Sequence, residues 1–178
     1  LYLPDAYSGR LFLDPAVTSD WHRLRLLIAG GLRQAETDRL AAALRLVRGA
    51  PLADAAPGQW HWAEELRTDM LSVIRDLGIT LAERALGAGD VDLARWATAR
   101  ALAAVGSDER LLGARVKVED RAGNRPEVER LVGLITRQVR HLGVDLLPET
   151  IGLLQTVIEG QPRTGFGWCA PVPVLQDA

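Results

Sequence analysis

Metal binding or nucleophilic catalysis in this chain would depend on three histidines and a single cysteine. His22, His61 and His141 fall on three separate predicted helices, and no two of them have the spacing of metal ligands. Cys169 lies in a segment rich in proline and glycine, without a neighbouring histidine or helix N-terminus that would activate its thiol. We therefore expect no metal site, no cofactor and no catalytic cysteine.

Carboxylates gather at Glu64, Glu65 and Asp69, near the start of a long predicted helix. Acid–base catalysis by such groups needs a shaped pocket that makes one carboxylate a better acid than the other. The sequence around these three residues gives no sign of one. We interpret them as part of a solvated helix face, and we expect the protein not to be an enzyme.

A basic region extends over residues 121–141. A solvated helix surface is one interpretation of it, and a docking surface for an acidic partner is the other. We take Arg121, Arg125 and Arg137 as its candidate partner-binding residues. The arginines of the region are Arg121, Arg125, Arg130, Arg137 and Arg140, and the interleaved carboxylates are Glu119, Asp120, Glu127 and Glu129.

Two tryptophans, Trp60 and Trp62, stand where a predicted loop over residues 49–59 meets the following helix. Such side chains can pack in the core or stack against a binding partner. We favour core packing, and we keep both residues as candidates for partner binding.

The composition narrows the class of protein. The 178 residues are 48% hydrophobic with a formal net charge of −2, which argues against a free-standing nucleic-acid binder. No apolar run reaches the length of a membrane span, and the N-terminus lacks a signal-peptide pattern. With one cysteine, the reducing cytoplasm is the expected compartment. Because the chain begins with Leu1 rather than methionine, we expect it to be a piece of a longer protein.

Helical periodicity dominates the middle of the chain. Apolar residues at spacings of three and four, with capping residues and glycine or proline stops, predict a helical domain over residues 18–159. We expect Thr37 and Ser107 to cap two of the helices, and Gly78 to kink or split the longest. Residues 1–17 are interpreted as an extended segment with a strand candidate at 10–13, and residues 160–178 as a Pro/Gly-rich tail. The predicted helices cover residues 18–29, 37–48, 60–87, 91–105, 107–122, 126–142 and 148–158.

A repeat gives the strongest indication of architecture. The turns at Gly89-Asp90 and Gly123-Asn124 are separated by about 34 residues, which is the period of the tetratricopeptide (TPR) helix pair. The helix after the first turn carries alanines on one face, so a neighbouring helix can approach closely, and we expect Ala101 to be buried there. The fold class we predict is all-α, a TPR-like array of helical hairpins with a short N-terminal extended or strand segment.

A family resemblance covers most of the chain, from about Arg10 to Ile158. The chain resembles the bacterial transcriptional activator domain of the antibiotic-regulatory-protein family of actinobacterial transcription regulators. Each matching segment is short, and their order and spacing together carry the resemblance. The segments are residues 10–17 with Asp20-Trp21, residues 43–44 with 48–54, Trp60 with 64–67, residues 81–83 with 89–90, residues 101–102, 108–109 and 123–125, and residues 142–145 with 148–150.

The resemblance implies a non-catalytic regulatory domain. It would mediate self-association or contact RNA polymerase or a neighbouring domain. Members of the family usually carry a winged helix-turn-helix just before this domain. Here that module is absent or survives only as the strand at residues 10–13, so DNA binding is expected only through a module outside this chain. Residues 1–4 also resemble larger relatives joined to membrane-anchored or peptidoglycan-binding regions. The alternative is therefore a protein-interaction scaffold in a larger envelope-associated protein, still without membrane contact by this chain itself.

Overall fold

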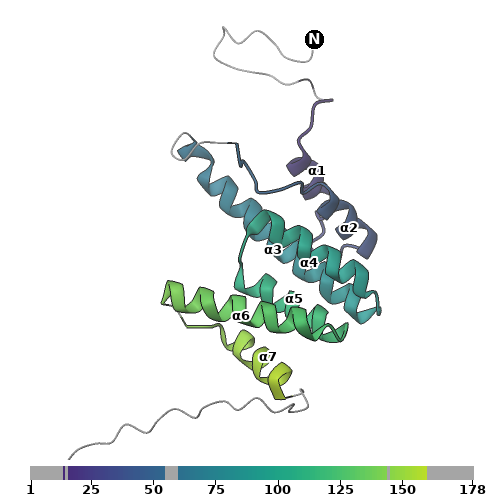
Figure 1. Cartoon of the computed structure of the whole chain (residues 1–178). Helices are drawn as coiled ribbons and strands as arrows, with labels where there is room; N and C mark the ends of the chain where they lie inside the picture. Colours follow the sequence, from purple (N-terminus) through teal and green to yellow (C-terminus); the bar gives the residue numbers. More distant parts are fainter. Residues whose placement is uncertain (1–13, 15, 55–59, 144, 160–178) are drawn as a thin grey trace, which may run out of the picture.

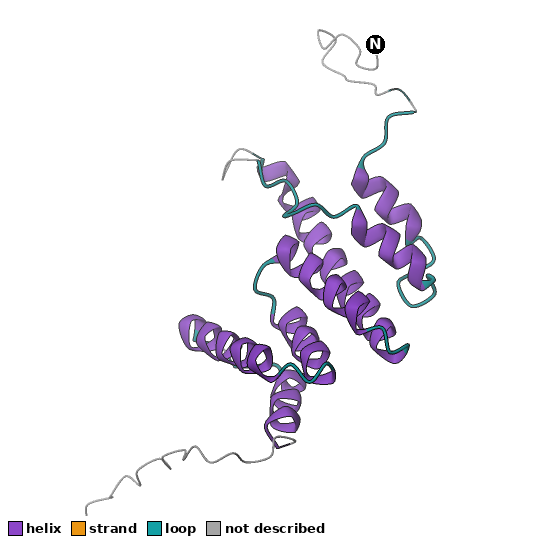
Figure 2. Cartoon of the chain, turned by 45° about the vertical axis from the view of Figure 1, so that its right-hand side comes forward, coloured by secondary structure: helices purple, strands orange, loops and turns teal. Residues whose placement is uncertain are grey.

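The computed structural model describes residues 14, 16–54, 60–143 and 145–159, and this part of the chain is helical, without a strand (Figures 1 and 2). The all-α prediction is therefore confirmed, whereas the strand candidate at 10–13 and the tail at 160–178 lie outside the described residues. The helices are α1 (Asp20–Leu27), α2 (Thr37–Arg45), the 3₁₀ turn η2 (His61–Ala63), α3 (Glu64–Gly87), α4 (Val91–Val105), α5 (Glu109–Arg121), α6 (Arg125–Leu142) and α7 (Pro148–Glu159).

Three helices, α1, α4 and α5, begin at a short polar side chain that accepts from an unpaired backbone amide. The Asp90 carboxylate accepts from the Leu93 amide at 2.9 Å, where α4 begins as predicted. The Ser107 cap predicted for α5 is wrong. Asp108, one residue later, holds the cap position and accepts from the Leu111 amide at 3.1 Å. Its carboxylate also interacts favourably with the positive end of the helix dipole.

The start of α2 also differs from the prediction. Thr37 is the first helical residue, and Glu36 occupies the cap position with extended backbone and without a side-chain cap hydrogen bond. At α1, by contrast, the Ser19 hydroxyl accepts from the His22 amide at 3.1 Å and caps the helix. The threonine is thus one residue too far along the chain to act as Ser19 does.

The two glycine turns have the same backbone conformation. Gly89 and Gly123 have φ values of +79° and +69°, in the left-handed region where glycine avoids the steric penalty of a Cβ. Each glycine lies just after the last turn of one helix, α3 or α5, and lets the chain reverse into the next. Figure 1 shows both turns on the same side of the array.

The backbone hydrogen bonds of the two turns also match. The Asp90 amide donates to the carbonyl of Ala85 at 2.8 Å, and the Asn124 amide donates to the carbonyl of Glu119 at 2.9 Å. Both are six-to-one bonds of the Schellman type, which satisfy carbonyls left open at a helix end. The predicted equivalence of the two turns is therefore found in their backbone geometry.

Gly78 marks the closest approach between α3 and α4. The helix is continuous through Gly78, so the predicted split is wrong. A Cβ built on Gly78 would lie 2.4 Å from the Cβ of Ala101, far inside van der Waals contact. Ala101 is fully buried, as predicted. The glycine is therefore required because α4 crosses directly over it.

The corresponding positions in the next helix pair hold larger side chains. Leu112 and Ile135 stand one repeat period after Gly78 and Ala101, and both are buried in the core between α5, α6 and α7. Branched side chains at both positions hold two helix axes farther apart than Gly and Ala do. The second pair thus repeats the turn of the first without repeating its close contact.

Helix α5 contributes to two hydrophobic cores. Leu111 and Val118 belong to the core that α5 shares with α1–α4, whereas Leu112 and Val116 belong to the core with α6 and α7. All four side chains are buried. In Figure 1, α5 lies between the α3–α4 pair and the α6–α7 part of the array. This position explains why α5 has buried residues on two of its sides.

The contact between Gly78 and Ala101 leads to a first prediction. Gly78→Ala should lower the free energy of unfolding by about 1–3 kcal/mol, because the added methyl group overpacks the α3–α4 crossing. Thermal or urea unfolding followed by circular dichroism measures the change. Gly87→Ala is the matched control on the same helix, since a Cβ there meets nothing within 4 Å. Equal stability of the two variants would contradict the close crossing.

Candidate functional site

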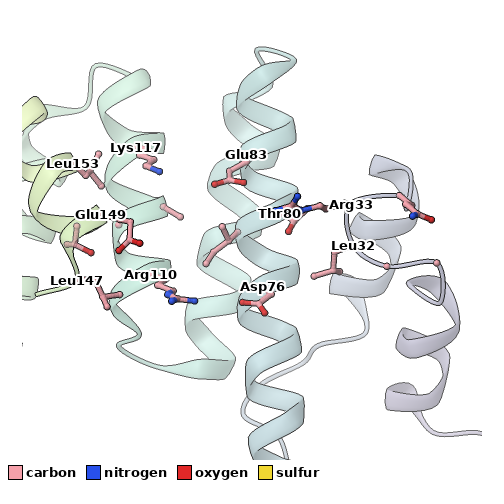
Figure 3. A pocket seen from close by; sticks show the side chains of 17 residues that line it. Leu32, Arg33, Asp76, Thr80, Glu83, Arg110, Lys117, Leu147, Glu149 and Leu153 are labelled. Carbon is pink, nitrogen blue, oxygen red and sulfur yellow. The ribbon is translucent and has the colours of Figure 1, made fainter.

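A groove of about 920 Å³ lies between α3 and α5. The loop at residues 30–34 extends one side of it, and the start of α7 extends the other. We call it the α3–α5 groove, and Figure 3 shows the side chains that line it. Its charged residues are Arg33, Asp76, Glu83, Arg110, Lys117 and Glu149.

The wall from α3 is acidic because of the spacing of its residues. Asp76, Thr80 and Glu83 follow one another at intervals of four and three, which places them on one face of the helix. The first and the last are about 10 Å apart along the helix axis. Figure 3 shows Glu83 extending from α3 toward α5, whereas Thr80 lies on the side of α3 next to Arg33.

The wall from α5 is basic and has the same spacing. Arg110, Ala114 and Lys117 lie at intervals of four and three, so the two cations are also about 10 Å apart. Gly113 and Ala114 are buried between them and keep this part of the groove free of bulky side chains. Figure 3 shows Arg110 extending from α5 toward α3. An acidic row and a basic row thus lie on the two facing helices.

Arg84 fixes the loop that extends the acidic side of the groove. Its guanidinium donates to the carbonyls of Leu32 at 3.1 Å and Arg33 at 2.5 Å, and also to the carbonyl of Ala35. These charge-assisted bonds attach the loop between α1 and α2 to the last turn of α3. The position of Leu32 and Arg33 beside the groove therefore depends on one arginine.

The opposite side of the groove is fixed by the start of α7. The Leu147 amide donates to a Glu109 carboxylate oxygen at 2.8 Å, which joins this end of α7 to the first turn of α5. The Cδ2 of Leu153 lies 3.6 Å from where a Cβ on Gly113 would stand. The side chains of α7 therefore pack directly against the small residues of α5.

The charges of the groove are mostly left without ion-pair partners. Arg33, Glu83, Arg110, Lys117 and Glu149 form no ion pair with any residue that the structure describes. All five are exposed. They are therefore available to charged groups of a binding partner.

Asp76 differs from the other charges of the groove, because it accepts from the Arg75 Nε at 2.9 Å through Oδ1. This hydrogen bond is the main reason why the pKa of Arg75 lies above its ordinary value. The second oxygen of Asp76 has no hydrogen-bond donor among the described residues. Asp76 can therefore still accept from a ligand.

The aromatic candidates lie on the surface. Trp62 is 77% exposed and Trp60 39% exposed, and their rings stack on each other with centroids 5.7 Å apart. The prediction that they pack in the core is wrong. Ala63 is buried at the end of η2 and fills the inward position of this short turn. The two indole rings are therefore left outside, and Leu66 in the first turn of α3 is exposed as well.

The arginine candidates lie elsewhere on the molecule. Arg121, Arg125 and Arg137 are exposed, and none of them forms an ion pair within the described part of the chain. Arg125 and Arg137 stand about 18 Å apart along α6. In Figure 1 the N-terminal end of α3, which follows the tryptophans, lies on the side away from the α5–α6 turn. The structure therefore does not bring the five predicted site residues together into one site.

Glu119 is a buried exception within the basic region. The interpretation of this region as a solvated surface does not hold for Glu119, which is fully buried. Arg95 binds both of its oxygens, Nε to Oε1 at 2.9 Å and Nη2 to Oε2 at 3.0 Å. Arg115 reaches Oε1 at 2.8 Å, and the Asn124 side-chain amide donates to Oε2 at 2.9 Å. The carboxylate thus ties α4, α5 and the turn before α6 to one another.

The environment of Glu119 changes its protonation. Burial raises the pKa of its carboxyl group. Hydrogen bonds from Arg95 and Asn124, with the positive charges of Arg115 and Arg95, outweigh burial and bring the pKa below its ordinary value. The charged form is therefore the one that the fold stabilises.

The three histidines lie apart, whereas Glu64, Glu65 and Asp69 line one shallow hollow on α3. His22, His61 and His141 are exposed on separate elements, and the described residues contain no group of three His, Cys, Asp or Glu side chains arranged to hold a metal ion. Cys169 lies outside the described residues. Glu64, Glu65 and Asp69 are exposed, and Asp69 lies 3.9 Å from Arg25.

None of the helices within residues 14, 16–54, 60–143 and 145–159 combines the length and the apolar character needed to cross a bilayer. No protein-family model, curated protein or solved structure matches the chain.

The sequence reasoning missed the α3–α5 groove. Its signal was present as charged residues at intervals of seven, Asp76 with Glu83 and Arg110 with Lys117. That interval places two residues on one helix face, but it does not say which helix faces which. The packing of α3 against α5 supplies that information.

The Glu119 network leads to a second prediction. Glu119→Gln should lower the free energy of unfolding at pH 7 by about 3 kcal/mol, because it leaves Arg95 and Arg115 without their charged partner. The wild type should lose this stabilisation as pH falls below the ordinary glutamate pKa of 4.5, since the folded-state pKa is lower still. Urea unfolding between pH 3 and 7 measures both effects.

Glu129→Gln is the control for this experiment. Glu129 is exposed on α6 and forms no ion pair among the described residues. This variant should keep the stability and the pH dependence of the wild type, whereas Glu119→Gln should show a flatter pH dependence. An unchanged acid-dependent loss of stability in Glu119→Gln would contradict the role of the buried carboxylate.

Proposed function

We propose that this chain is a non-catalytic, TPR-like interaction domain that acts as the regulatory part of a bacterial transcription regulator. One observation carries the proposal: the same turn recurs at Gly89 and Gly123, in an array whose helices line a groove. The interval between these turns, about 34 residues, is typical of tetratricopeptide helix pairs.

The packing of the helices supports this type of array. Helices α3, α5 and α7 follow one another along the groove, while α4 packs on α3 and α6 packs on α5. Short helix pairs bury their apolar faces by stacking, and the surface of the stack is commonly used to bind other proteins. The α1–α2 pair adds the loop that Arg84 holds beside the groove.

The assignment to transcription depends on the resemblance of residues 10–158 to the bacterial transcriptional activator domain. The domain would then associate with itself, with RNA polymerase or with a neighbouring domain. The exposed pair of Trp60 and Trp62 suits such contacts, because stacked tryptophans offer a large apolar area at little entropic cost. Their mutual stacking also orders both rings before a partner arrives.

A third prediction tests this proposal. Sedimentation velocity of the chain, alone and with bacterial RNA polymerase holoenzyme, should reveal a dimer or a complex with the polymerase. Trp60→Ser with Trp62→Ser should weaken that association at least tenfold and change the thermal midpoint little, because both rings are outside the core. Trp96→Phe, at a partly buried position, is the control. Absence of both forms of association would contradict self-association and polymerase binding as the role of this domain.

A fourth prediction concerns DNA. The chain should not bind duplex DNA with submicromolar, sequence-selective affinity, because phosphate contacts need several uncompensated cations on one face. Arg130 is already neutralised by Glu127 at 2.7 Å, and Arg125 and Arg137 lie far apart on α6. Fluorescence anisotropy with a random-sequence duplex pool, followed by selection, measures this at physiological salt. Selective binding that disappears in Arg125→Glu/Arg137→Glu would move DNA recognition into this domain.

A further inference from the structure

We propose that the α3–α5 groove binds an extended peptide segment in which basic and acidic side chains alternate. The inference rests on the proposed function, an interaction domain, and names the chemistry of its partner. Basic side chains of the peptide would face Asp76 and Glu83 on α3. Acidic side chains would face Arg110 and Lys117 on α5.

The separation of charge across the groove is the first argument. Helix α3 carries two carboxylates and α5 carries two cations, and Arg33 beside α3 and Glu149 on α7 beside α5 reduce the charge of each side without cancelling it. The described part of the chain gives Glu83, Arg110 and Lys117 no ion-pair partner. Asp76 has one oxygen free of its bond to Arg75. A ligand of a single charge would be attracted by one wall and repelled by the other. A ligand with opposite charges on its two edges satisfies both walls.

The spacing along the walls is the second argument. The two charges on each helix are about 10 Å apart along the axis, because seven residues rise by 1.5 Å each. An extended chain rises about 3.3 Å per residue and points successive side chains to opposite sides. Side chains on one edge of such a chain therefore recur about every 6.6 Å, against about 10 Å between the charges on each wall, and about six residues with alternating signs cover both charged rows. Long side chains such as arginine and glutamate accommodate the remaining difference in register.

The residues between the charged rows favour a peptide backbone. Gly113 and Ala114 line the groove on α5 with small side chains, and Leu153 of α7 packs against Gly113. Thr80 stands between Asp76 and Glu83 and offers a hydroxyl group to backbone amides or carbonyls. Nucleic acid suits this groove poorly, because Asp76, Glu83 and Glu149 would repel its phosphates.

The test uses two N-acetylated, fluorescein-labelled hexapeptides of identical composition, RERERE and RRREEE. Anisotropy titrations of the full chain at low salt should show at least tenfold tighter binding of RERERE. The preference should decrease as salt screens the paired charges. Equal binding of the two peptides would overturn the proposal, since only the alternating one matches both walls at once.

Charge reversal identifies the groove as the binding site. Arg110→Glu/Lys117→Glu should weaken RERERE binding at least tenfold. Adding Asp76→Arg and Glu83→Arg should restore the binding, because the reversed walls accept the same alternating peptide shifted by one residue. A merely structural role of these residues would not give this rescue. Asp76→Arg could destabilise the fold. In that case the affinity of Glu83→Arg/Lys117→Glu for RERERE is compared with that of Lys117→Glu alone, and the double variant should bind more tightly.

Arg23→Glu/Arg39→Glu is the matched control. Both arginines are exposed on α1 and α2, outside the groove, and form no ion pair with described residues. Their reversal changes the net charge by the same amount as Arg110→Glu/Lys117→Glu, and the affinity for RERERE should stay within about twofold of the wild type, as expected for distant screened charges. An equal loss in both variants would show that net charge, not the groove, attracts the peptide.

Lys117 provides an independent measurement, because it is the only lysine in the sequence. Acetylation of its amine by a succinimidyl ester, followed by mass spectrometry, should slow several-fold with RERERE and remain unchanged with RRREEE. Unchanged reactivity at saturating RERERE would overturn the proposal even if the peptide binds elsewhere. Sedimentation velocity with the polymerase, repeated on the groove variants, distinguishes failure of the groove proposal from failure of the transcriptional proposal. Association without a peptide preference contradicts the groove alone, and a peptide preference without association contradicts the transcriptional role alone.

Discussion

The contact between Gly78 and Ala101 is the constraint on which the arrangement of the array depends. With no side chain on Gly78, α4 lies directly against one face of α3. The charged row of Asp76, Thr80 and Glu83 occupies a different face of α3, which borders the groove. A displacement of α4 at the crossing would therefore be transmitted to the acidic wall. The contact between Gly78 and Ala101 thus determines where Asp76 and Glu83 lie on the opposite side of α3.

The two turns show how a repeated backbone can serve different side-chain roles. Asp90 uses its carboxylate to cap α4 at the Leu93 amide, whereas Asn124 at the equivalent position turns its amide toward Glu119. The start of α6 then has no side-chain cap hydrogen bond. Instead of a cap, the second turn contributes Asn124 to the network in which the buried Glu119 carboxylate joins α4 and α5 through Arg95. The two turns thus share a backbone conformation, but their side chains make different hydrogen bonds.

Most helix boundaries followed from the sequence, because apolar periodicity and capping residues are local signals. The start of α4 at Val91, after Asp90, is one example. Gly78 was misinterpreted because a helix-breaking glycine and a close-packing glycine look alike without knowledge of the crossing helix. Glu119 was misplaced because its burial depends on Arg95, 24 residues away. The tryptophans were misplaced because residue type alone does not determine which side of a short 3₁₀ turn faces the core.

Helix α5 has a consequence for how the molecule unfolds. Because Leu111 and Leu112 point into two different cores, loss of either core exposes an apolar face of α5 to water. Neither half of the array can unfold alone without exposing an apolar face of α5. Separate unfolding of α6 and α7 is therefore unfavourable. A ligand held between α3 and α5 would touch both halves at once. Occupancy would then strengthen the cooperativity of the whole array rather than the rigidity of one loop.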